Sequence, residues 1–165
     1  NGALDVALEL NSLSKSSNMA GWRVGMLAGA EARLNEVIRF KSNMDSGMFL
    51  PVQEAAAVAL SLGPEWYADL NNTYRRRREK VYRLLDLLRC RYDRSQAGLF
   101  IWAAIPDHYA DGYALSDEVL SQARVFITPG GIFGENGKSY IRVSLCASET
   151  VLEEALGRIT EMISN

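Results

Sequence analysis

A lysine follows an apolar segment near the start of the chain, in a place where a lysine could do chemistry. Val6 to Leu10 is apolar-rich and reads as a buried strand, and Lys15 lies in the polar segment just after it. Ammonium groups are strongly hydrated and are rarely buried without a partner. Two interpretations are open: Lys15 is an ordinary solvated loop residue, or its amine is a nucleophile that forms a Schiff base with a carbonyl cofactor.

Hydroxyl and guanidinium groups flank this lysine. Ser12 precedes Lys15 by three residues, Ser14 is its direct neighbour, and Arg23 follows it by eight. A phosphorylated aldehyde would need this set, because hydroxyls and a planar, permanently charged guanidinium bind phosphate while an amine attacks the aldehyde carbon. These neighbours favour the nucleophilic interpretation of Lys15.

The whole segment resembles a known family. Ser-Leu-Ser-Lys-x-x-x-Met-x-Gly-Trp-Arg-x-Gly, from Ser12 to Gly25, is similar to the Schiff-base lysine region of pyridoxal-phosphate (PLP) enzymes of fold type I, specifically the class I and II aminotransferases. The resemblance implies that Lys15 carries pyridoxal 5'-phosphate and that Ser12 and Arg23 bind its phosphate. It also implies a supporting role for Ser14.

An arginine near the end of the chain is the second candidate. In the expected strand 139–145, Arg142 shares a face with Tyr140 and Ser144, and the opposite face is apolar. Arg142 is either a solvated residue or the ligand of an anion. The context Thr-Pro-Gly-Gly-x-Phe-Gly followed by Tyr-Ile-Arg-Val-Ser-Leu resembles the carboxy-terminal signature of the same aminotransferases. That resemblance implies that Arg142 binds the α-carboxylate of the amino acid, for which a planar fork is suited.

Composition excludes several other classes of protein. The net charge of -2 argues against a dedicated nucleic-acid binder, and no apolar run is long enough to span a membrane. Cys90 and Cys146 form neither a metal pattern nor a disulfide framework, which favours the cytoplasm. The single histidine, His108, is expected in a solvent-facing loop, so a histidine-centred metal site or catalytic triad has little to build on.

Hydrophobic periodicity and turn residues predict the elements that must position these side chains. Arg75 to Arg78 fall inside the longest expected helix, where consecutive residues scatter around the circumference, so we expect a solvated face with Asp69 and Glu79 as partners. The expected helices are 31–43, 51–62, 65–91, 113–123 and one that Ser148 or Thr150 caps; the expected strands are 26–28, 98–106, 125–128 and 139–145.

The resemblance implies an α/β fold in which a long helix joins two parts. Residues 1–63 would be the end of the large PLP-binding α/β domain of fold type I. Residues 64–165 would be the connecting helix and the small α+β carboxy-terminal domain. The family's partners of the cofactor ring would precede anything matched here, so we expect a carboxy-terminal portion of a longer enzyme, inactive alone. The segment Ser46 to Leu50 would contact the second subunit of a homodimer.

The implied function is transfer of an amino group between an amino acid and a 2-keto acid. The freed Lys15 amine would shuttle the proton from the substrate Cα as general base and acid. Aspartate, alanine, aromatic and diaminopimelate aminotransferases share these residues. Of the four, an aspartate-like substrate is favoured, because the segment Met19 to Gly25 looks most like the bacterial subgroup that contains the aspartate enzymes. Two alternatives stay open: a PLP-dependent lyase or decarboxylase of the same fold, and an aminotransferase-like domain of a transcription regulator.

Overall fold

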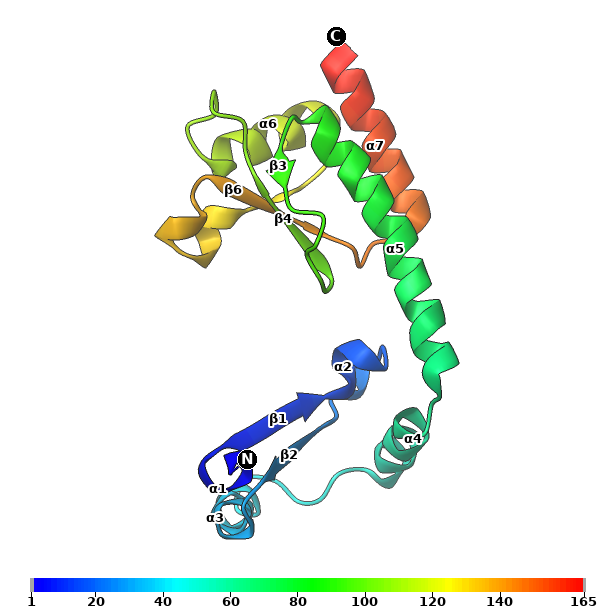
Figure 1. Cartoon of the computed structure of the whole chain (residues 1–165), viewed down its shortest axis with the longest axis vertical. Helices are drawn as coiled ribbons and strands as arrows, with labels where there is room; N and C mark the ends of the chain where they lie inside the picture. Colours follow the sequence, from blue (N-terminus) through cyan, green and yellow to red (C-terminus); the bar gives the residue numbers. More distant parts are fainter. Residues whose placement is uncertain (1, 165) are drawn as a thin grey trace. The chain divides into compact units, whose positions relative to one another are not determined.

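The computed structural model describes residues 2–164 and divides the chain into two compact units, residues 1–68 and 69–165. The division falls inside helix α5 (Pro64–Leu87), the longest element of the chain (Figure 1). The boundary expected from the sequence, between residues 63 and 64, lies at the start of this helix. The expected helix over 65–91 is confirmed, but it ends four residues early, because Arg89 adopts the left-handed conformation at φ 54°.

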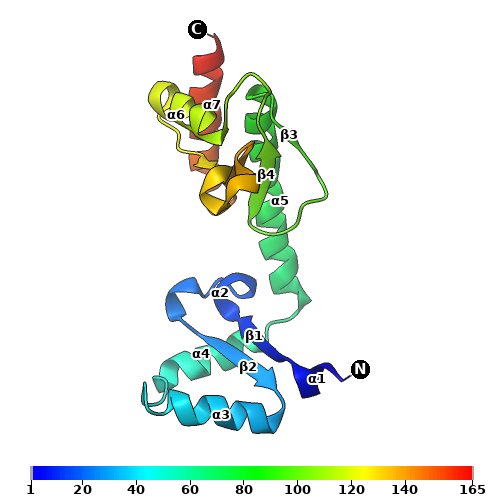
Figure 2. The same ribbon diagram turned by 90° about the vertical axis from the view of Figure 1, so that its left-hand side faces the viewer.

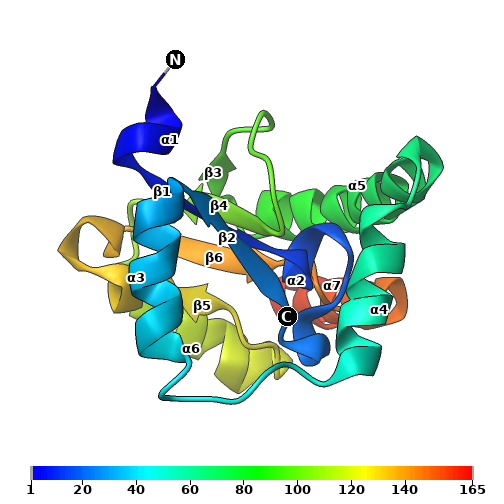
Figure 3. The ribbon, with the colours of Figure 1, turned by 90° about the horizontal axis from the view of Figure 1, so that it is seen from below.

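The first unit is built on a two-stranded hairpin. Its strands β1 (Leu8–Ser12) and β2 (Gly25–Gly29) are antiparallel, and Ser12 pairs with Gly25 at one end (Figure 3). The hairpin follows the short helix α1 (Ala3–Val6), and β1 therefore starts two residues later than the expected strand. The expectation that this strand is buried is wrong for the described residues, since all of β1 is exposed and it pairs with β2 alone.

Two helices complete the first unit before α5 begins. Helix α3 (Glu31–Lys41) lies beside β2, and helix α4 (Leu50–Leu60) carries Pro51 in its first turn, as expected for a residue without an N–H donor (Figure 3). Only one stripe of α4 packs, with Ala56 and Ala59 buried, while Val58 and Leu60 are exposed. One face of this alanine-rich helix is therefore packed, and the opposite face is exposed.

The second unit contains a four-stranded antiparallel sheet of order β3-β4-β6-β5. Helix α7 (Glu149–Ser164) lies alongside α5 next to this sheet in two views at right angles to each other (Figures 1 and 2). Buried apolar residues of β4 and β6 alternate with exposed or half-exposed ones, as the sequence predicts. The elements that follow α5 are β3 (Arg91–Tyr92), β4 (Phe100–Ala104), α6 (Gly112–Ala123), β5 (Thr128–Pro129), β6 (Tyr140–Ser144) and α7 (Glu149–Ser164).

One expected strand is mostly wrong. Of residues 125–128, only Thr128 is in a strand, because the ladder with β6 is limited to two pairs, Thr128 with Arg142 and Pro129 with Ile141. Two 3-10 turns, η2 (Gly130–Phe133) and η3 (Glu135–Gly137), then lead to β6. Helix α7 is capped by Ser148, whose hydroxyl accepts a bond from the Val151 N–H at 3.3 Å.

The core of the second unit lies between the sheet and its helices. The apolar faces of β4 and β6 pack against the apolar stripes of α5, α6 and α7, and several of these side chains are fully buried. This arrangement leaves the opposite face of the sheet free for other contacts. The fully buried side chains are Val81, Leu85, Ile101, Leu115, Ser116, Val119, Ile141, Leu145 and Ile159.

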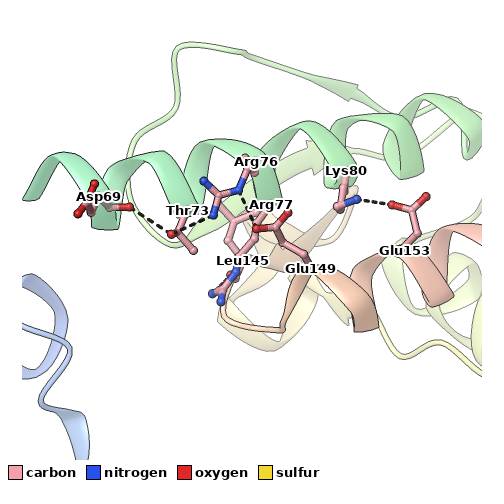
Figure 4. Close-up of polar contacts among 8 residues, drawn as sticks. All are labelled: Asp69, Thr73, Arg76, Arg77, Lys80, Leu145, Glu149 and Glu153. Atoms are coloured by element: carbon pink, nitrogen blue, oxygen red, sulfur yellow. Dashed lines mark hydrogen bonds and ion pairs between the residues drawn. The ribbon is translucent and has the colours of Figure 1, made fainter.

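The run of arginines on α5 is not a purely solvated face, and the expected partners Asp69 and Glu79 are wrong. Arg76 Nε donates to Glu149 Oε1 at 2.8 Å, and Lys80 one turn later pairs with Glu153, so both cations tie α5 to α7 (Figure 4). The reason is that the partners come from 73 residues further along the chain, a separation that helical spacing does not reveal.

The next two arginines tie α5 to the sheet. Arg77 Nη1 donates to the carbonyl of Leu145, just after β6, at 3.1 Å (Figure 4). Arg78 donates to the carbonyls of Gln96 and Gly98, just before β4. Sequence inspection cannot assign backbone carbonyls as acceptors. Here their hydrogen bonds with the arginines connect helix α5 to the end of β6 and to the segment before β4.

Candidate active-site residues

The first candidate group follows from the way β1 ends. Ser12 is the last residue of β1 and the N-cap of the one-turn helix α2 (Leu13–Ser16), and its Oγ accepts a bond from the Ser14 N–H at 3.2 Å. Lys15 lies on that turn, exposed. Because strand, cap and turn follow one another without a spacer, the lysine is held directly at the strand end.

Buried neighbours anchor this turn. Leu13, Met19 and Val24 are each no more than 8% exposed, and they pack with Ala56 and Ala59 of α4. The Leu13 N–H donates to the Val24 carbonyl at 3.4 Å, and the Leu13 carbonyl accepts from the Met19 N–H at 3.2 Å. Leu13, Met19 and Val24 therefore face inward, whereas Ser12, Lys15 and Arg23 are exposed.

Arg23 lies at the same end of the hairpin. It is two residues before Gly25, the strand partner of Ser12, and has a left-handed backbone at φ 54° and ψ 47°. Its Nη1 donates to the Ala20 carbonyl at 2.9 Å, which uses one of its five N–H donors and fixes the side chain. Strained left-handed residues are common at functional sites.

A cavity of about 440 Å³ joins several of these groups. Its lining includes Ser12, Ser14, Arg23 and Lys41, and the Lys41 ammonium is paired with Asp45 at 2.6 Å. Lys15 is not part of the lining. The structure thus brings the three expected phosphate-binding residues to one cavity and places the expected nucleophile on the adjoining turn.

This donor set fits the phosphate of PLP. Two hydroxyls and a guanidinium with free N–H groups converge on one cavity, and such groups bind phosphate oxygens with charge-assisted hydrogen bonds. Gly25 makes the convergence possible, since a Cβ there would lie 2.6 Å from the Asn11 carbonyl oxygen. Ser12, Ser14 and Arg23 would therefore hold the phosphate, and Lys15 would hold the aldehyde end.

Arg142 belongs to the second unit. It is half-buried on β6, where it pairs with Trp102 on one side and Thr128 on the other. It shares a sheet face with Tyr140 and Ser144, as the alternation predicts. Among residues 2–164 its guanidinium makes no hydrogen bond or ion pair, and its contacts are with the rings of Phe100 and Phe133. Its N–H donors are thus available to an anion.

The two phenylalanines were missed by sequence reasoning. Phe133 is the aromatic residue of Thr-Pro-Gly-Gly-x-Phe-Gly, and Phe100 alternates with Trp102 on β4, so both signals were visible in the sequence. What the sequence does not show is that both rings contact Arg142. Of the other expected features, His108 is exposed, and Cys90 and Cys146 are free thiols.

Comparison with known proteins gives the family. The family model described as "Aminotransferase class I and II" matches residues 2–159. The chain belongs to the class I and II aminotransferase family. Enzymes of this family depend on PLP, which agrees with the phosphate-binding donor set of the first unit.

Relatives in this aminotransferase family are longer than the chain. It is 42% identical over 164 residues to LL-diaminopimelate aminotransferase of Oleidesulfovibrio alaskensis, an alignment that covers 98% of this chain and 41% of the relative. It is 38% identical to the enzyme of the same name from Maridesulfovibrio salexigens, again with 98% and 41% covered. The chain thus spans about two fifths of the length of these relatives.

Solved structures agree with this assignment. The chain matches apo BacF from Bacillus subtilis with a TM-score of 0.86 and 35% identity, over 97% of this chain and 41% of that one. It matches the aromatic aminotransferase of Pyrococcus horikoshii with a TM-score of 0.87 and 28% identity, over 99% and 44%. Both comparisons support the α/β aminotransferase fold. Among residues 2–164, no helix has the length and apolarity needed to cross a membrane.

Proposed function

We propose that this chain supplies the cofactor lysine and the substrate-carboxylate arginine of a PLP-dependent aminotransferase. The observation that carries the proposal is the cavity at the end of β1, which Ser12, Ser14 and Arg23 share, with Lys15 on the adjoining turn. When bound, PLP supplies an electron sink that stabilises a negative charge at the substrate Cα. Each remaining role falls to a residue of this chain.

In the first unit, phosphate binding and proton transfer fall to different, neighbouring residues. The Ser12 hydroxyl and the Arg23 guanidinium would bind the phosphate with support from Ser14, and the Lys15 amine Nζ would hold the aldehyde end. With the substrate bound, the same Nζ would take the proton from the substrate Cα as general base and return it as general acid.

In the second unit, Arg142 orients the amino acid. A guanidinium that presents two parallel N–H groups binds both oxygens of an α-carboxylate, which fixes the direction of the Cα–H bond. Its freedom from other polar partners in the described part of the chain supports this role. A lysine at the same position would supply charge without that orientation.

Borohydride labelling tests the assignment of the lysine. The aminotransferase that contains this chain is loaded with PLP, reduced with borohydride and digested, and the pyridoxyl-bearing peptide is identified by mass spectrometry. We expect the label on Lys15. Lys41, which lines the cavity shared by Ser12, Ser14 and Arg23, is the internal control. A label on Lys41, or an unlabelled Lys15, would overturn the proposal.

The substrate is proposed from the relatives. The two relatives from Oleidesulfovibrio and Maridesulfovibrio are LL-diaminopimelate aminotransferases, so LL-diaminopimelate, with a 2-keto acid as acceptor, is the first donor to test. The motif from Met19 to Gly25 favours aspartate, which serves as the competing donor. Keto-acid-dependent amino transfer, measured against release of amine or of an eliminated group, separates an aminotransferase from the lyase alternative.

Assembly and location belong to the same proposal. We expect a homodimer, with the segment Ser46 to Leu50 at the subunit contact. Met48, Phe49 and Leu50 are each more than 40% exposed, which leaves apolar side chains available for such a contact. A cytoplasmic location is expected from the two unpaired thiols. Light scattering of the aminotransferase that contains this chain, with and without Phe49→Asp, measures the contribution of this segment.

A further inference from the structure

The most unusual feature outside the proposed cofactor cavity is the environment of Arg142. Its Cζ atom lies 4.2 Å from the ring centroid of Phe100 and 4.3 Å from that of Phe133, over both rings. A guanidinium within about 6 Å of a ring centroid is attracted by the negative charge of the ring face. Arg142 therefore has two aromatic contacts in place of the carboxylate or carbonyl that usually positions an arginine.

The sheet and the turn after it place these two rings. Phe100 stands on β4, two residues before Trp102, the strand partner of Arg142. Phe133 ends η2, and its ring meets the Trp102 ring edge-on at 5.9 Å. The Trp102 ring in turn stacks on Tyr140 at 5.4 Å. The Phe133 ring is thus supported by the Trp102 ring, which is itself stacked on Tyr140.

Glycine is required for Phe133 to reach this place. A Cβ on Gly130 would lie 2.8 Å from the Trp102 ring and 2.4 Å from the Gly137 carbonyl oxygen. A Cβ on Gly131 would lie 2.6 Å from the Tyr113 ring. Any other residue at position 130 would push the turn away from Trp102 and carry Phe133 away from Arg142, and any other residue at position 131 would displace the Tyr113 ring.

Aromatic contacts have a chemical consequence that polar contacts lack. A carboxylate or carbonyl would accept hydrogen bonds from the guanidinium, whereas an aromatic ring attracts its charge and leaves the N–H donors for another partner. The side chain is then held in place with its hydrogen-bonding capacity unused. This suits an arginine whose partner is a ligand rather than the protein.

We propose that Phe100 and Phe133 are positioning residues that hold the Arg142 guanidinium between their rings without using its N–H donors, so that these donors are presented to the substrate carboxylate. The proposal rests on the proposed aminotransferase function, because that function provides the carboxylate. It goes beyond it by assigning the orientation of the fork to two phenyl rings, neither of which has a polar group to bind substrate.

A test on the 165-residue chain needs no activity. The Arg142 Nε–H signal is followed by NMR in the wild type and in Phe100→Leu, Phe133→Leu and Phe133→Tyr. Both Leu variants should move the signal downfield, because ring shielding is lost, and lower its order parameter below about 0.6. Phe133→Tyr keeps the ring and should leave the signal unchanged, which separates the ring's role from simple loss of packing.

Phe126→Leu is the matched control, since Phe126 is 66% exposed and lies outside the Arg142 site. It should leave the Arg142 signal unchanged. The proposal is overturned if the Leu variants do not change the shift and order parameter, or if Phe126→Leu changes them equally. Backbone amide spectra confirm that each variant is folded; an unfolded Leu variant is replaced by the corresponding Met variant.

A kinetic test on the aminotransferase that contains this chain follows. Loss of one ring should raise KM for the amino acid by roughly 3- to 30-fold, the range expected for one cation–π contact, and leave kcat within about twofold. A fall in kcat at constant KM would overturn the positioning role. Absence of amino transfer in the wild type would instead overturn the proposed function, so the two failures are distinguishable.

Discussion

The two units of this chain differ in how much apolar surface they bury. The second unit closes a core between a four-stranded sheet and three helices, in which Leu85, Ile101 and Ile141 are fully buried. The first unit buries a small cluster around Leu13 and Val24 and leaves strand β1 of its hairpin exposed. The proposed covalent chemistry therefore lies in the sparsely packed unit, and the proposed substrate recognition lies in the densely packed one.

This difference has a thermodynamic consequence. An isolated two-stranded hairpin is marginally stable in water, whereas a larger sheet packed on helices supports itself. Large apolar side chains of the first unit remain exposed, among them Leu10 at 84%, Phe40 at 70% and Phe49 at 73%. We therefore expect the first unit to open at a lower free energy than the second, which amide exchange can measure unit by unit.

The largest effect expected is on activity. Lys15→Ala should lower amino transfer by about a thousandfold or more in the aminotransferase that contains this chain, because covalent binding and proton transfer share one amine. Steady-state assays with saturating donor measure it. Lys138→Ala, an exposed lysine of the second unit paired with Glu135 at 3.7 Å, is the control and should retain activity. Substantial turnover by Lys15→Ala would contradict the proposal that the first unit carries the covalent chemistry.

One buried and one exposed aliphatic residue, each replaced by alanine, test the difference in packing between the two units. Ile101→Ala should lower the free energy of unfolding of the second unit by about 2–5 kcal/mol, because Ile101 is fully buried between sheet and helices. Leu10→Ala in the first unit should change stability by no more than about 0.5 kcal/mol, since that side chain is 84% exposed. Urea unfolding, monitored by amide exchange, measures the change in free energy for both variants. Equal losses in the two variants would mean that the units are not packed as differently as described.

Reaction with thiol reagents reports on the second unit alone, because both cysteines lie there. Exposed Cys146 should react with a thiol reagent at pH 8 at least about a hundredfold faster than buried Cys90, whose labelling requires opening of the core. Burial also raises the pKa of Cys90 from 9.0 to about 12. Rapid labelling of Cys90 in the native chain would show that this core opens easily.

The sign of the pH effect follows from that shift. Below pH 9 the thiol is protonated in both folded and unfolded chains, so its contribution is constant. Above pH 9 the unfolded chain releases the proton and the folded chain keeps it, so stability of the second unit should fall as pH rises from about 9 toward 12. Urea midpoints at pH 8 and pH 10 measure this, and Cys90→Ala should weaken the dependence.

The smallest effect expected is on stability, when a hydrogen bond between an arginine of α5 and the sheet is removed. Arg77→Met should destabilise the second unit by about 1–2 kcal/mol, because the Leu145 carbonyl loses its donor while the apolar stem is kept. Arg75→Met should change stability by less than about 0.5 kcal/mol, since exposed Arg75 bonds only Asn72 of its own helix. Thermal unfolding compares them. Equal stabilities would show that the arginine run is a solvated face after all.

Local patterns predicted much of this chain correctly. The strand 139–145, with Arg142 on its half-exposed face, is confirmed, because strict alternation is enough to assign faces of a strand with one buried side. The serine cap before α7 is confirmed for the same reason, since it depends on neighbours within one turn.

Errors arose where a partner distant in sequence decides the structure. Val125 to Ile127 have strand-forming side chains, but only Thr128 and Pro129 find a partner in β6. The apolar sequence of β1 predicts a buried strand, but burial depends on the segments that cover it. In the described part of the chain β1 pairs only with β2. Side-chain preference indicates what a segment can form, and available partners decide what it does form.

By itself, the sequence determined the chemical groups and their order: an amine, hydroxyls and a guanidinium in one segment, and a second guanidinium on an alternating strand. Tertiary structure alone decided that Ser12 and Arg23 share a cavity, that Arg77 bonds the carbonyl after β6, and that two phenyl rings contact Arg142. The physical reason is the range of each interaction. Capping and alternation act between chain neighbours, whereas cavities, carbonyl acceptors and ring contacts exist only after distant segments have packed together.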